Sequence, residues 1–411
     1  MNYGTRFIEK KIKQLASYYK VILVTGTRQV GKSTILTKLF PDYKHITFDP
    51  VQDIYRARID PDLFLDNFPS PLILDEIQYV PELLPAIKRR VDNDDSKGQY
   101  FLTGSQNLSM LKTVSESMAG RVGIIKLENM LPIEMIGIGN TNKNWLNKFL
   151  NDPQIFDGKI SLLSNFNTNL VEFLWRGTMP GLLDMPDSIV PTYYDSYVQT
   201  YIERDVRTIA NIKELRDFGM FIRIGSALTS QEINSSQIGR EIGITPDTAR
   251  RWLNILNYSY QWIELPPYFG NTIKRVSKKK KGYFTDTGLI CYLQSISSPD
   301  ALAASPNLGA IFETFAVNLI IKQISRLKYS PTLYHWRTNG GAEVDVVLEI
   351  DNNLFPIEIK CKTNLSLHDT RGIKSFMKTY SNKCNYGIIF YAGKECYRIS
   401  EFIWAIPWLA I

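Results

Sequence analysis

Apolar and polar positions alternate in two different ways along the first 130 residues. Residues 21–25 form a short run of apolar and β-branched side chains, as expected for a strand that is buried on both faces. Four later runs have the same character, at residues 45–48, 71–74, 100–103 and 122–127. Residues 6–19 and 35–40 instead place apolar side chains at helical spacing. Strands that alternate with helices in this way predict an α/β fold with a parallel sheet.

Helical spacing dominates after residue 130. Residues 131–222 contain helical stretches around a bend that Pro180 fixes, and we expect a helical lid there. Residues 235–256 predict a helix, a turn and a second helix. The turn contains Gly243, and Thr245 has the side chain of an N-cap for the second helix. This segment therefore predicts a helix-turn-helix.

The C-terminal part combines one helix with several strands. Residues 312–321 predict the helix and residues 334–337 a strand. Residues 341–348 and 354–360 predict a β-hairpin around Asp351, Asn352 and Asn353. We therefore expect four units along the chain, at residues 1–130, 131–222, 223–300 and 301–411.

Composition restricts the class of protein. The chain has 411 residues, of which 44% are hydrophobic and 22% charged, so it is long enough for several globular units. Residues 1–20 carry early charges and no apolar stretch typical of a signal peptide, and no apolar run reaches about 20 residues, so we expect a cytoplasmic protein without a membrane contact. The four cysteines are too scattered for a zinc cage or a disulfide framework, so we expect reduced thiols at Cys291, Cys361, Cys384 and Cys396.

A phosphate-binding loop follows the first strand. The pattern G-x-x-x-x-G-K-[ST] is matched by Gly26, Thr27, Arg28, Gln29, Val30, Gly31, Lys32, Ser33 and Thr34. The two glycines permit a tight turn whose backbone N–H groups converge on phosphate oxygens. Lys32 would reach the β- and γ-phosphates, and the Ser33 hydroxyl would bind Mg²⁺. The cofactors expected from this loop are ATP and Mg²⁺.

Two neighbouring acids end the strand at residues 71–74. Asp75 can hold the Mg²⁺ shell, while Glu76 orients and deprotonates the attacking water. A surface turn can also carry an Asp-Glu pair. The buried strand before these acids and the phosphate-binding loop upstream favour the catalytic interpretation.

Three further polar residues have two interpretations each. Ser105 either contacts the γ-phosphate or the attacking water, or caps the next helix. Arg121, at the end of a helix, either acts on the γ-phosphate of a neighbouring subunit or complements the helix dipole. Arg6 either reaches the nucleotide or is an exposed charge at the start of a helix.

These motifs together resemble those of the AAA+ ATPases. The resemblance rests on GTRQVGKST, LILDEIQ, FLTGSQ and SMAGRV, in this order. It is closer to a bacterial and archaeal family of predicted ATPases with a long C-terminal region, because YVQTYIERDV at residues 197–206 and YFTDTGL at residues 283–289 are similar to its other signatures. The resemblance covers nearly the whole chain and implies a P-loop AAA+ ATPase core with a helical lid.

Basic residues gather in and after the predicted helix-turn-helix. The net charge of the chain is +7, and residues 235–282 hold nine Lys or Arg against three acids. If the segment after the second helix is the wing of a winged helix, phosphates of DNA would contact Arg250, Arg251, Lys278, Lys279, Lys280 and Lys281. The alternatives are a protein-docking module and a lysine-rich hairpin that is simply solvated.

A second set of charged residues lies on the C-terminal helix and hairpin. Glu313, Asp345, Glu358 and Lys360 resemble the PD-(D/E)xK nuclease core, which has an acid on its first helix, an acid on one strand and E-x-K on the next. Asp345 and Glu358 can share hard divalent ions, and Lys360 can position the hydrolytic water. Alternating charges also occur in any half-exposed hairpin, and nuclease-like folds also serve as inactive binding modules.

The sequence as a whole predicts an ATP-driven molecular switch. Its fold class is α/β: a P-loop AAA+ domain with a helical lid, a winged helix-turn-helix and a restriction-endonuclease-like C-terminal domain. The expected partners are DNA and, through Arg121, a second copy of the chain. The alternative is a signalling or scaffold ATPase whose C-terminal domains hold a protein partner without nuclease activity.

Overall fold

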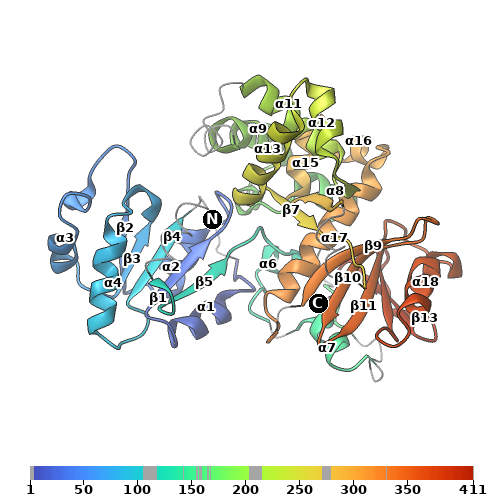
Figure 1. Cartoon of the computed structure of the whole chain (residues 1–411), viewed down its shortest axis with the longest axis horizontal. Coiled ribbons are helices and arrows are strands. Elements are labelled where there is room, and N and C mark those ends of the chain that lie inside the picture. Colours follow the sequence, from blue (N-terminus) through green and yellow to red (C-terminus); the bar gives the residue numbers. More distant parts are fainter. Residues whose placement is uncertain are drawn as a thin grey trace.

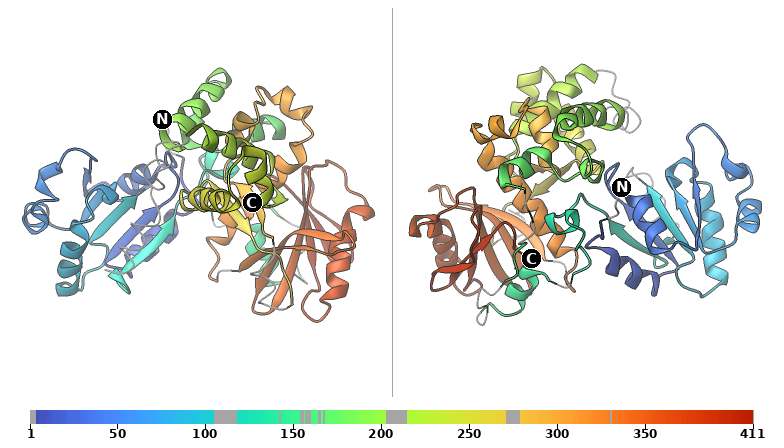
Figure 2. Two further views of the ribbon diagram at one scale, coloured as in Figure 1. Left: turned by 45° about the horizontal axis from the view of Figure 1, so that its top comes forward. Right: turned by 180° about the vertical axis from the view of Figure 1, so that it is seen from behind.

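The chain forms two bodies that lie side by side. The computed structural model describes residues 4–104, 118–141, 143–153, 156, 160–163, 166, 168–202, 215–270, 279–329 and 331–410. One body holds the N-terminal sheet, and the other holds the helices and the sheet of the C-terminal two thirds (Figures 1 and 2). In the described ranges, every helix is too short or too polar to cross a lipid bilayer.

The N-terminal body is built on a parallel sheet with the strand order β2-β3-β4-β1-β5. Its strands are β1 (Val21–Thr25), β2 (Lys44–Thr47), β3 (Leu72–Asp75), β4 (Tyr100–Gly104) and β5 (Val122–Lys126). All residues of β1, β3 and β4 are buried, which explains why these runs are continuously apolar in the sequence. The five predicted strands and their parallel arrangement are confirmed.

Helices cover both faces of this sheet. They are α1 (Glu9–Ala16), α2 (Lys32–Leu39), α3 (Pro61–Asn67) and α4 (Leu83–Asn93). One apolar cluster joins α1 and α2 to the sheet, and a second joins α3 and α4 to it. Helix α1 is shorter than the predicted 6–19. In this α/β arrangement, loops at the carboxyl ends of β1 and β3 meet at one edge, where ligands of such sheets bind.

The predicted lid is divided between two neighbours. Helices α6 (Pro132–Met135) and α7 (Trp145–Asn151) belong to its first part. There Trp145 stacks on Phe390, and Phe149 meets Phe355 edge to face, so this part packs on the C-terminal sheet. Its second part, α8 (Leu170–Arg176) and α9 (Val190–Tyr197), packs instead on α15 (Thr287–Leu293). Large aromatic side chains in residues 145–156 explain the first contact, because they need an apolar surface to cover them.

Residues 235–258 form a helix, a turn and a second helix, as the sequence predicts. The helices of this part of the chain are α11 (Leu215–Ala227), α12 (Ser235–Ile242) and α13 (Pro246–Tyr258). Gly243 ends α12 in the left-handed conformation, and the Thr245 hydroxyl accepts a hydrogen bond from the Thr248 N–H as the cap of α13. The strands β6 (Gln231–Glu232), β7 (Trp262–Leu265) and β8 (Lys281–Phe284) form an antiparallel sheet in the order β6-β8-β7.

The C-terminal part is a six-stranded mixed sheet with the order β13-β14-β12-β11-β10-β9. Its strands are β9 (Thr332–Arg337), β10 (Glu343–Ile350), β11 (Asn353–Lys360), β12 (Gly387–Tyr391), β13 (Tyr397–Ser400) and β14 (Ile403–Pro407). The predicted hairpin is confirmed, and Asp351 and Asn352 form its turn with positive φ angles. The helices of this part are α16 (Pro299–Ala303), α17 (Leu308–Ile324) and α18 (Arg371–Thr379).

Most of the second body packs around one large hydrophobic core, and two smaller apolar clusters lie on its C-terminal sheet. The large cluster includes Phe7 of the N-terminal body and buried residues of α7, α8, α13, α15, α17 and the C-terminal sheet. The three units predicted for this part of the chain therefore share one core. Burial of apolar area is the main favourable term in folding, so these segments stabilise one another.

Asp286 lies where this second body meets the N-terminal one. Its carboxylate is 1% exposed and accepts hydrogen bonds from donors in several segments. One oxygen accepts from Asn129 Nδ2 at 3.1 Å and from the N–H of Thr178 at 2.9 Å. The other accepts from the Tyr194 hydroxyl at 2.7 Å and from the N–H of Leu289 at 2.9 Å. This one carboxylate therefore fixes the relative positions of residues 129, 178 and 194 and of α15.

We expect Asp286→Ala to lower the free energy of unfolding by about 3 kcal/mol or more, because it leaves several buried donors without an acceptor. The midpoint of urea unfolding measures this change. Asp300→Ala is the matched control, since Asp300 is an exposed acid at the start of α16, and its removal should change stability by at most about 0.5 kcal/mol. Equal midpoints for the two variants would contradict the role of Asp286.

Candidate functional site

The phosphate-binding loop connects β1 to α2. Gly26 has φ +141°, and a Cβ atom there would lie 2.1 Å from the carbonyl oxygen of Leu127, so the position requires glycine. Gly31 has φ +88° and caps α2, which places the amino end of the helix beside the loop. Lys32 is buried, and its ammonium donates to the carbonyls of Gly26 at 3.1 Å and Thr27 at 2.8 Å. The lysine therefore lies across the concave side of the loop.

Ser33 and Asp75 meet at the carboxyl edge of the sheet. The Ser33 hydroxyl donates to Asp75 Oδ2 at 2.7 Å, and Asp75 is buried. His45 Nε2 lies 3.6 Å from the same oxygen. A hydroxyl and a carboxylate are oxygen ligands of the kind that Mg²⁺ prefers, and here they come from the two motifs that predicted them. These residues fit the ion that the loop implies.

Thr103 is a member of this site that the sequence analysis missed. Its hydroxyl donates to Asp75 Oδ1 and accepts the backbone N–H of Glu76 at 3.2 Å. Both contacts follow from the pairing of β3 with β4, which brings the ends of the two strands together. The signal that could have found Thr103 is its place at the carboxyl end of a buried strand. Ser105, the predicted contact of the γ-phosphate or the water, lies outside the described residues.

Glu76 has a backbone conformation that is uncommon for glutamate. Its φ of 57° and ψ of 44° are left-handed, and it begins the 3₁₀ turn Ile77–Tyr79. Its carboxylate accepts a hydrogen bond from the side-chain amide of Gln78. Strain of this kind, of order 1–3 kcal/mol, is typical of residues held in place at functional sites.

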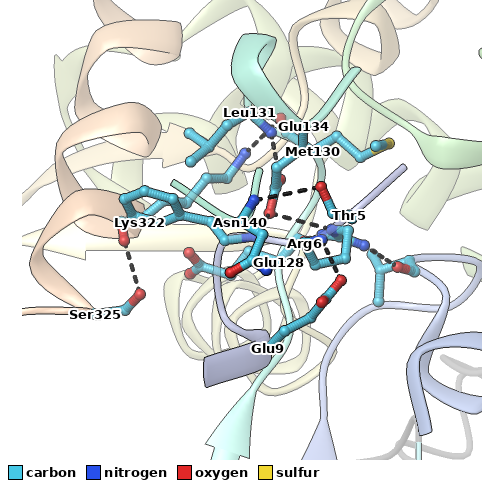
Figure 3. A network of polar contacts seen from close by, with 12 residues as sticks. Thr5, Arg6, Glu9, Glu128, Met130, Leu131, Glu134, Asn140, Lys322 and Ser325 are labelled. Carbon is cyan, nitrogen blue, oxygen red and sulfur yellow. Dashed lines mark hydrogen bonds and ion pairs between the residues drawn. The ribbon is translucent and has the colours of Figure 1, made fainter. Parts of the chain in front are cut away.

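Arg6 forms hydrogen bonds with the phosphate-binding loop and with the segment that follows β5. It is 5% exposed, which contradicts the interpretation of Arg6 as an exposed charge at the start of a helix, and it donates to the carbonyls of Val30 at 2.8 Å and Glu128 at 2.5 Å. Its Nε lies 3.2 Å from the Glu134 carboxylate (Figure 3). The guanidinium is thus used by the protein itself, because two carbonyls and one carboxylate face it.

The same network reaches the C-terminal helix α17. Lys322 is buried and donates to the carbonyl of Met130 at 3.2 Å (Figure 3). Burial lowers the pKa of Lys322. Leu131 donates its N–H to Glu134 at 2.6 Å, so the same carboxylate meets Arg6 and the segment that Lys322 contacts. Polar contacts therefore connect the loop to α17.

Two tyrosines of the second body touch the loop and the strand before it. The Tyr193 hydroxyl donates to Gln29 Oε1 at 2.7 Å, and the Tyr260 hydroxyl donates to Thr25 Oγ1 at 2.8 Å. Tyr260 has φ +60°, and Lys126 lies over its ring. The nucleotide-binding edge is therefore in contact with α9 and with the end of the helix-turn-helix segment.

Arg121 lies away from this edge. Its guanidinium pairs with Asp92, and both side chains are more than one third exposed. It also donates to the carbonyl of Ala119 at 3.0 Å. Such an exposed pair contributes little to stability, so it leaves the guanidinium available for another anion.

The charged residues predicted in the C-terminal part gather between α17 and the hairpin, together with a lysine of β8. Lys281 Nζ lies 2.6 Å from Glu313 Oε1 and 3.0 Å from Asp345 Oδ1. Lys360 lies 2.5 Å from Glu358 Oε1. We call these five residues the acid cluster. The sequence analysis grouped four of these residues, and the fifth, Lys281, lies 32 residues before Glu313 in the chain.

The position of Lys281 corrects the prediction that it contacts DNA. Its side chain is 12% exposed and points into the acid cluster. Lys279 and Lys280 are exposed, and Lys280 pairs with Glu264 at 2.8 Å, whereas Lys278 lies outside the described residues. The reason for the difference is that Lys281 begins β8, where pairing with β6 and β7 fixes its direction.

Burial and neighbouring charges together shift the pKa values of the acid cluster. Burial and the neighbouring Asp345 raise the pKa of Glu313 to about 7 and that of Glu358 to about 8. Burial opposes the ionisation of Asp345, but Lys281 and Lys360 outweigh it and lower the pKa of Asp345. Burial alone would lower the pKa of Lys281, but its acidic neighbours raise it well above its ordinary value. The cluster therefore contains a charged ammonium beside an ionised carboxylate.

Comparison with known proteins agrees with the N-terminal site. Residues 18–135 match the family model described as AAA domain. Residues 167–300 match a domain of unknown function (DUF8612), and residues 308–411 match another (DUF4143). The N-terminal part is thus an AAA domain, with the parallel five-stranded sheet typical of P-loop proteins of this class.

Two mycobacterial proteins that are described as uncharacterized match most of the chain. An uncharacterized protein of Mycobacterium tuberculosis, Rv2008c, is 27% identical over 388 residues, which are 94% of this chain and 80% of the relative. Among solved structures, a Walker-type ATPase of Pyrococcus abyssi has 15% identity and a TM-score of 0.40, and covers 70% of this chain and 94% of its own. The RuvB Holliday junction branch migration motor of Thermotoga maritima has 16% identity and a TM-score of 0.29, with 63% and 89% covered. Likeness at these scores supports no inference about this chain.

We expect Lys32→Ala to weaken the binding of a non-hydrolysed ATP analogue about tenfold to a hundredfold, because a hydrogen bond to a charged group contributes about 1.5–3 kcal/mol. Isothermal titration calorimetry measures the affinity. Lys38→Ala is the matched control, since Lys38 is exposed on the same helix, α2. Equal affinities of the two variants would remove the phosphate-binding role of Lys32.

Proposed function

We propose that the protein binds and hydrolyses ATP at the edge formed by the phosphate-binding loop and the end of β3. The hydrogen bond of 2.7 Å between Ser33 and Asp75 carries this proposal, because it joins the two motifs at one point. Backbone N–H groups of the loop and Lys32 would hold the phosphates. Ser33 and Asp75 would hold Mg²⁺, which supplies charge neutralisation to the phosphates when it is bound.

Glu76 is the proposed general base. It follows Asp75 directly, so its carboxylate is on the edge where the γ-phosphate would lie. Its backbone N–H donates to Thr103, and this contact supports the left-handed turn that aims the side chain. Thr103 is therefore a positioning residue for both acids.

Hydrolysis is proposed to depend on assembly through Arg121. The side chain is exposed at the surface and held by Asp92 alone among the acidic side chains of the described residues. An exposed ion pair of this kind is worth at most about 1 kcal/mol, so a phosphate of a second copy can replace Asp92. This would make a second subunit part of the catalytic site.

The nucleotide state is proposed to control DNA binding by the segment that contains α12 and α13. The observation that favours DNA is the exposure of Arg250 and Arg251 on α13, next to a three-stranded sheet that has Lys279 and Lys280 at its edge. This order of helices and strands resembles a winged helix, whose second helix contacts DNA. Tyr260, at the end of α13, touches the strand before the loop, which gives the two sites a physical connection.

The C-terminal part is proposed to process DNA. Its elements follow the order α17, β9, β10, β11, α18 and β12, and they bring Glu313, Asp345, Glu358 and Lys360 to one place. This supports the resemblance to a PD-(D/E)xK core. A scaffold ATPase without cleavage is the second candidate, and the observation that favours it is the ammonium of Lys281 within the acid cluster.

We expect Glu76→Gln to bind ATP as the wild type does and to hydrolyse it about a hundredfold more slowly or worse, because loss of a general base typically costs that much. Phosphate release and nucleotide affinity, measured on the same preparation, separate the two effects. Glu82→Gln is the matched control, because Glu82 is exposed six residues further along the chain. Wild-type turnover in Glu76→Gln would exclude Glu76 as the base.

We expect binding to duplex DNA to weaken with salt, and the slope of log K against log salt to fall by about 2 when both Arg250 and Arg251 are replaced by Ala, since each phosphate contact contributes about 0.9. Fluorescence anisotropy over a salt series measures the slope. The control replaces Lys374 and Lys378, two exposed cations on α18, and leaves the total charge change equal. An unchanged slope in the arginine variant would contradict DNA binding through α13. A separate test is the ATPase rate with and without DNA: stimulation by DNA favours the DNA-linked ATPase, and its absence favours the scaffold ATPase.

A further inference from the structure

Lys281 is held in the acid cluster by the backbone around it. It begins β8, which pairs with β6 on one side and with β7 on the other. The chain after β7 is in turn hydrogen-bonded to β9, because Tyr268 donates its N–H to the His335 carbonyl at 2.6 Å and His335 donates to the Pro266 carbonyl at 3.0 Å. The sheet that carries Lys281 is thus attached to the sheet that carries Asp345. The two sheets together therefore hold the backbone of Lys281 beside the strand that carries Asp345.

Two carboxylates face the single ammonium of Lys281. Glu313 and Asp345 both come within 3.0 Å of this nitrogen. The Tyr283 hydroxyl also donates to Glu313, at 2.8 Å, and the Ile359 N–H donates to Asp345 at 2.9 Å. Closely spaced carboxylates that keep only one positive charge between them repel each other, and a divalent ion would neutralise both.

A metal ion does not fit the cluster as it stands. Among the residues that the structure describes, no three His, Cys, Asp or Glu side chains gather closely enough to hold one. Glu358 is turned to Lys360, and its Oε2 is buried without a hydrogen-bond partner in the described part of the chain. The place between Glu313 and Asp345 is filled by Lys281. Buried carboxylate oxygens normally have a hydrogen-bond partner, so this arrangement of the cluster leaves one acceptor unsatisfied.

A polar cleft gives the lysine another position. The cleft has a volume of about 510 Å³ and lies between the β6 to α12 segment, the end of β9 and the start of β10. Lys281 and Glu313 form one of its walls, and Glu232, Arg337 and Glu343 contribute charged groups to the others. A lysine side chain is long and flexible, so rotation can carry its ammonium from the carboxylates into this cleft without a change in the sheet.

We propose that Lys281 is the built-in cation of the acid cluster and that its ammonium and a divalent metal ion exclude each other between Glu313 and Asp345. This inference rests on the proposed nuclease-like function for its meaning, since it states how that site is kept closed. A ligand that draws the ammonium into the cleft would therefore open the carboxylates to metal. The C-terminal site is therefore closed until the β8 segment is engaged.

Titration of nucleotide-free protein with Mn²⁺ by calorimetry tests this exclusion. Lys281→Met and Lys281→Gln should each bind one Mn²⁺ more tightly than the wild type, by about tenfold or more, because the competing charge is gone. Lys281→Gln keeps a hydrogen-bond donor, so it reports on the site even if the methionine variant folds poorly. Lys281→Arg keeps the positive charge and should behave as the wild type. Adding Asp345→Asn to Lys281→Gln should abolish the gain.

Equal Mn²⁺ affinity in the wild type and in both neutral variants would overturn the exclusion. So would a gain that persists after Asp345→Asn, since the ion would then lie elsewhere. Cleavage of linear DNA by the same proteins separates this result from the proposed function. Tighter Mn²⁺ binding without cleavage in the neutral variants leaves the exclusion standing and removes the nuclease proposal. Cleavage by the wild type, together with equal Mn²⁺ affinity in the wild type and the neutral variants, would keep the nuclease proposal and remove the exclusion.

Discussion

The carboxylate of Asp286 is the constraint on which the assembly of the second body depends. A buried charge is tolerated only when hydrogen bonds replace the water that it loses. Here the replacements come from Asn129, Thr178, Tyr194 and the start of α15, which lie far apart in the sequence. These segments must therefore assemble together around one group. Asn129 also accepts the Thr27 hydroxyl at 3.4 Å, so the same centre reaches the phosphate-binding loop.

Helix α17 connects two charged centres that have opposite requirements. Near its carboxyl end Lys322 contacts the segment beneath the nucleotide-binding loop, and near its amino end Glu313 enters the acid cluster. The loop offers backbone donors to an anion, whereas the cluster offers carboxylates to a cation. Helix α17 therefore contacts both centres, and its apolar residues belong to the large core of the second body.

Agreement between prediction and structure follows the range of the interactions involved. The loop, the five parallel strands, the helix-turn-helix and the β-hairpin were predictable, because glycine conformation, capping and residue periodicity act over a few positions. The meeting of Ser33 with Asp75 was also predictable, since strands of a parallel sheet end at the same edge. The division of the predicted lid was not predictable. Helical spacing shows which face of a helix is apolar, but it does not show on which other element that face packs.

The sequence by itself determined an α/β domain with a phosphate-binding loop, and it predicted the ligands to expect there, because each motif carries its own local geometry. Only the tertiary structure decided the roles of Thr103, Arg6, Asp286 and Lys281. From the sequence alone, Lys281 at the end of a lysine run could lie on an exposed wing or form a buried ion pair. Long-range packing decides between these two, because it places the C-terminal sheet with Asp345 next to β8.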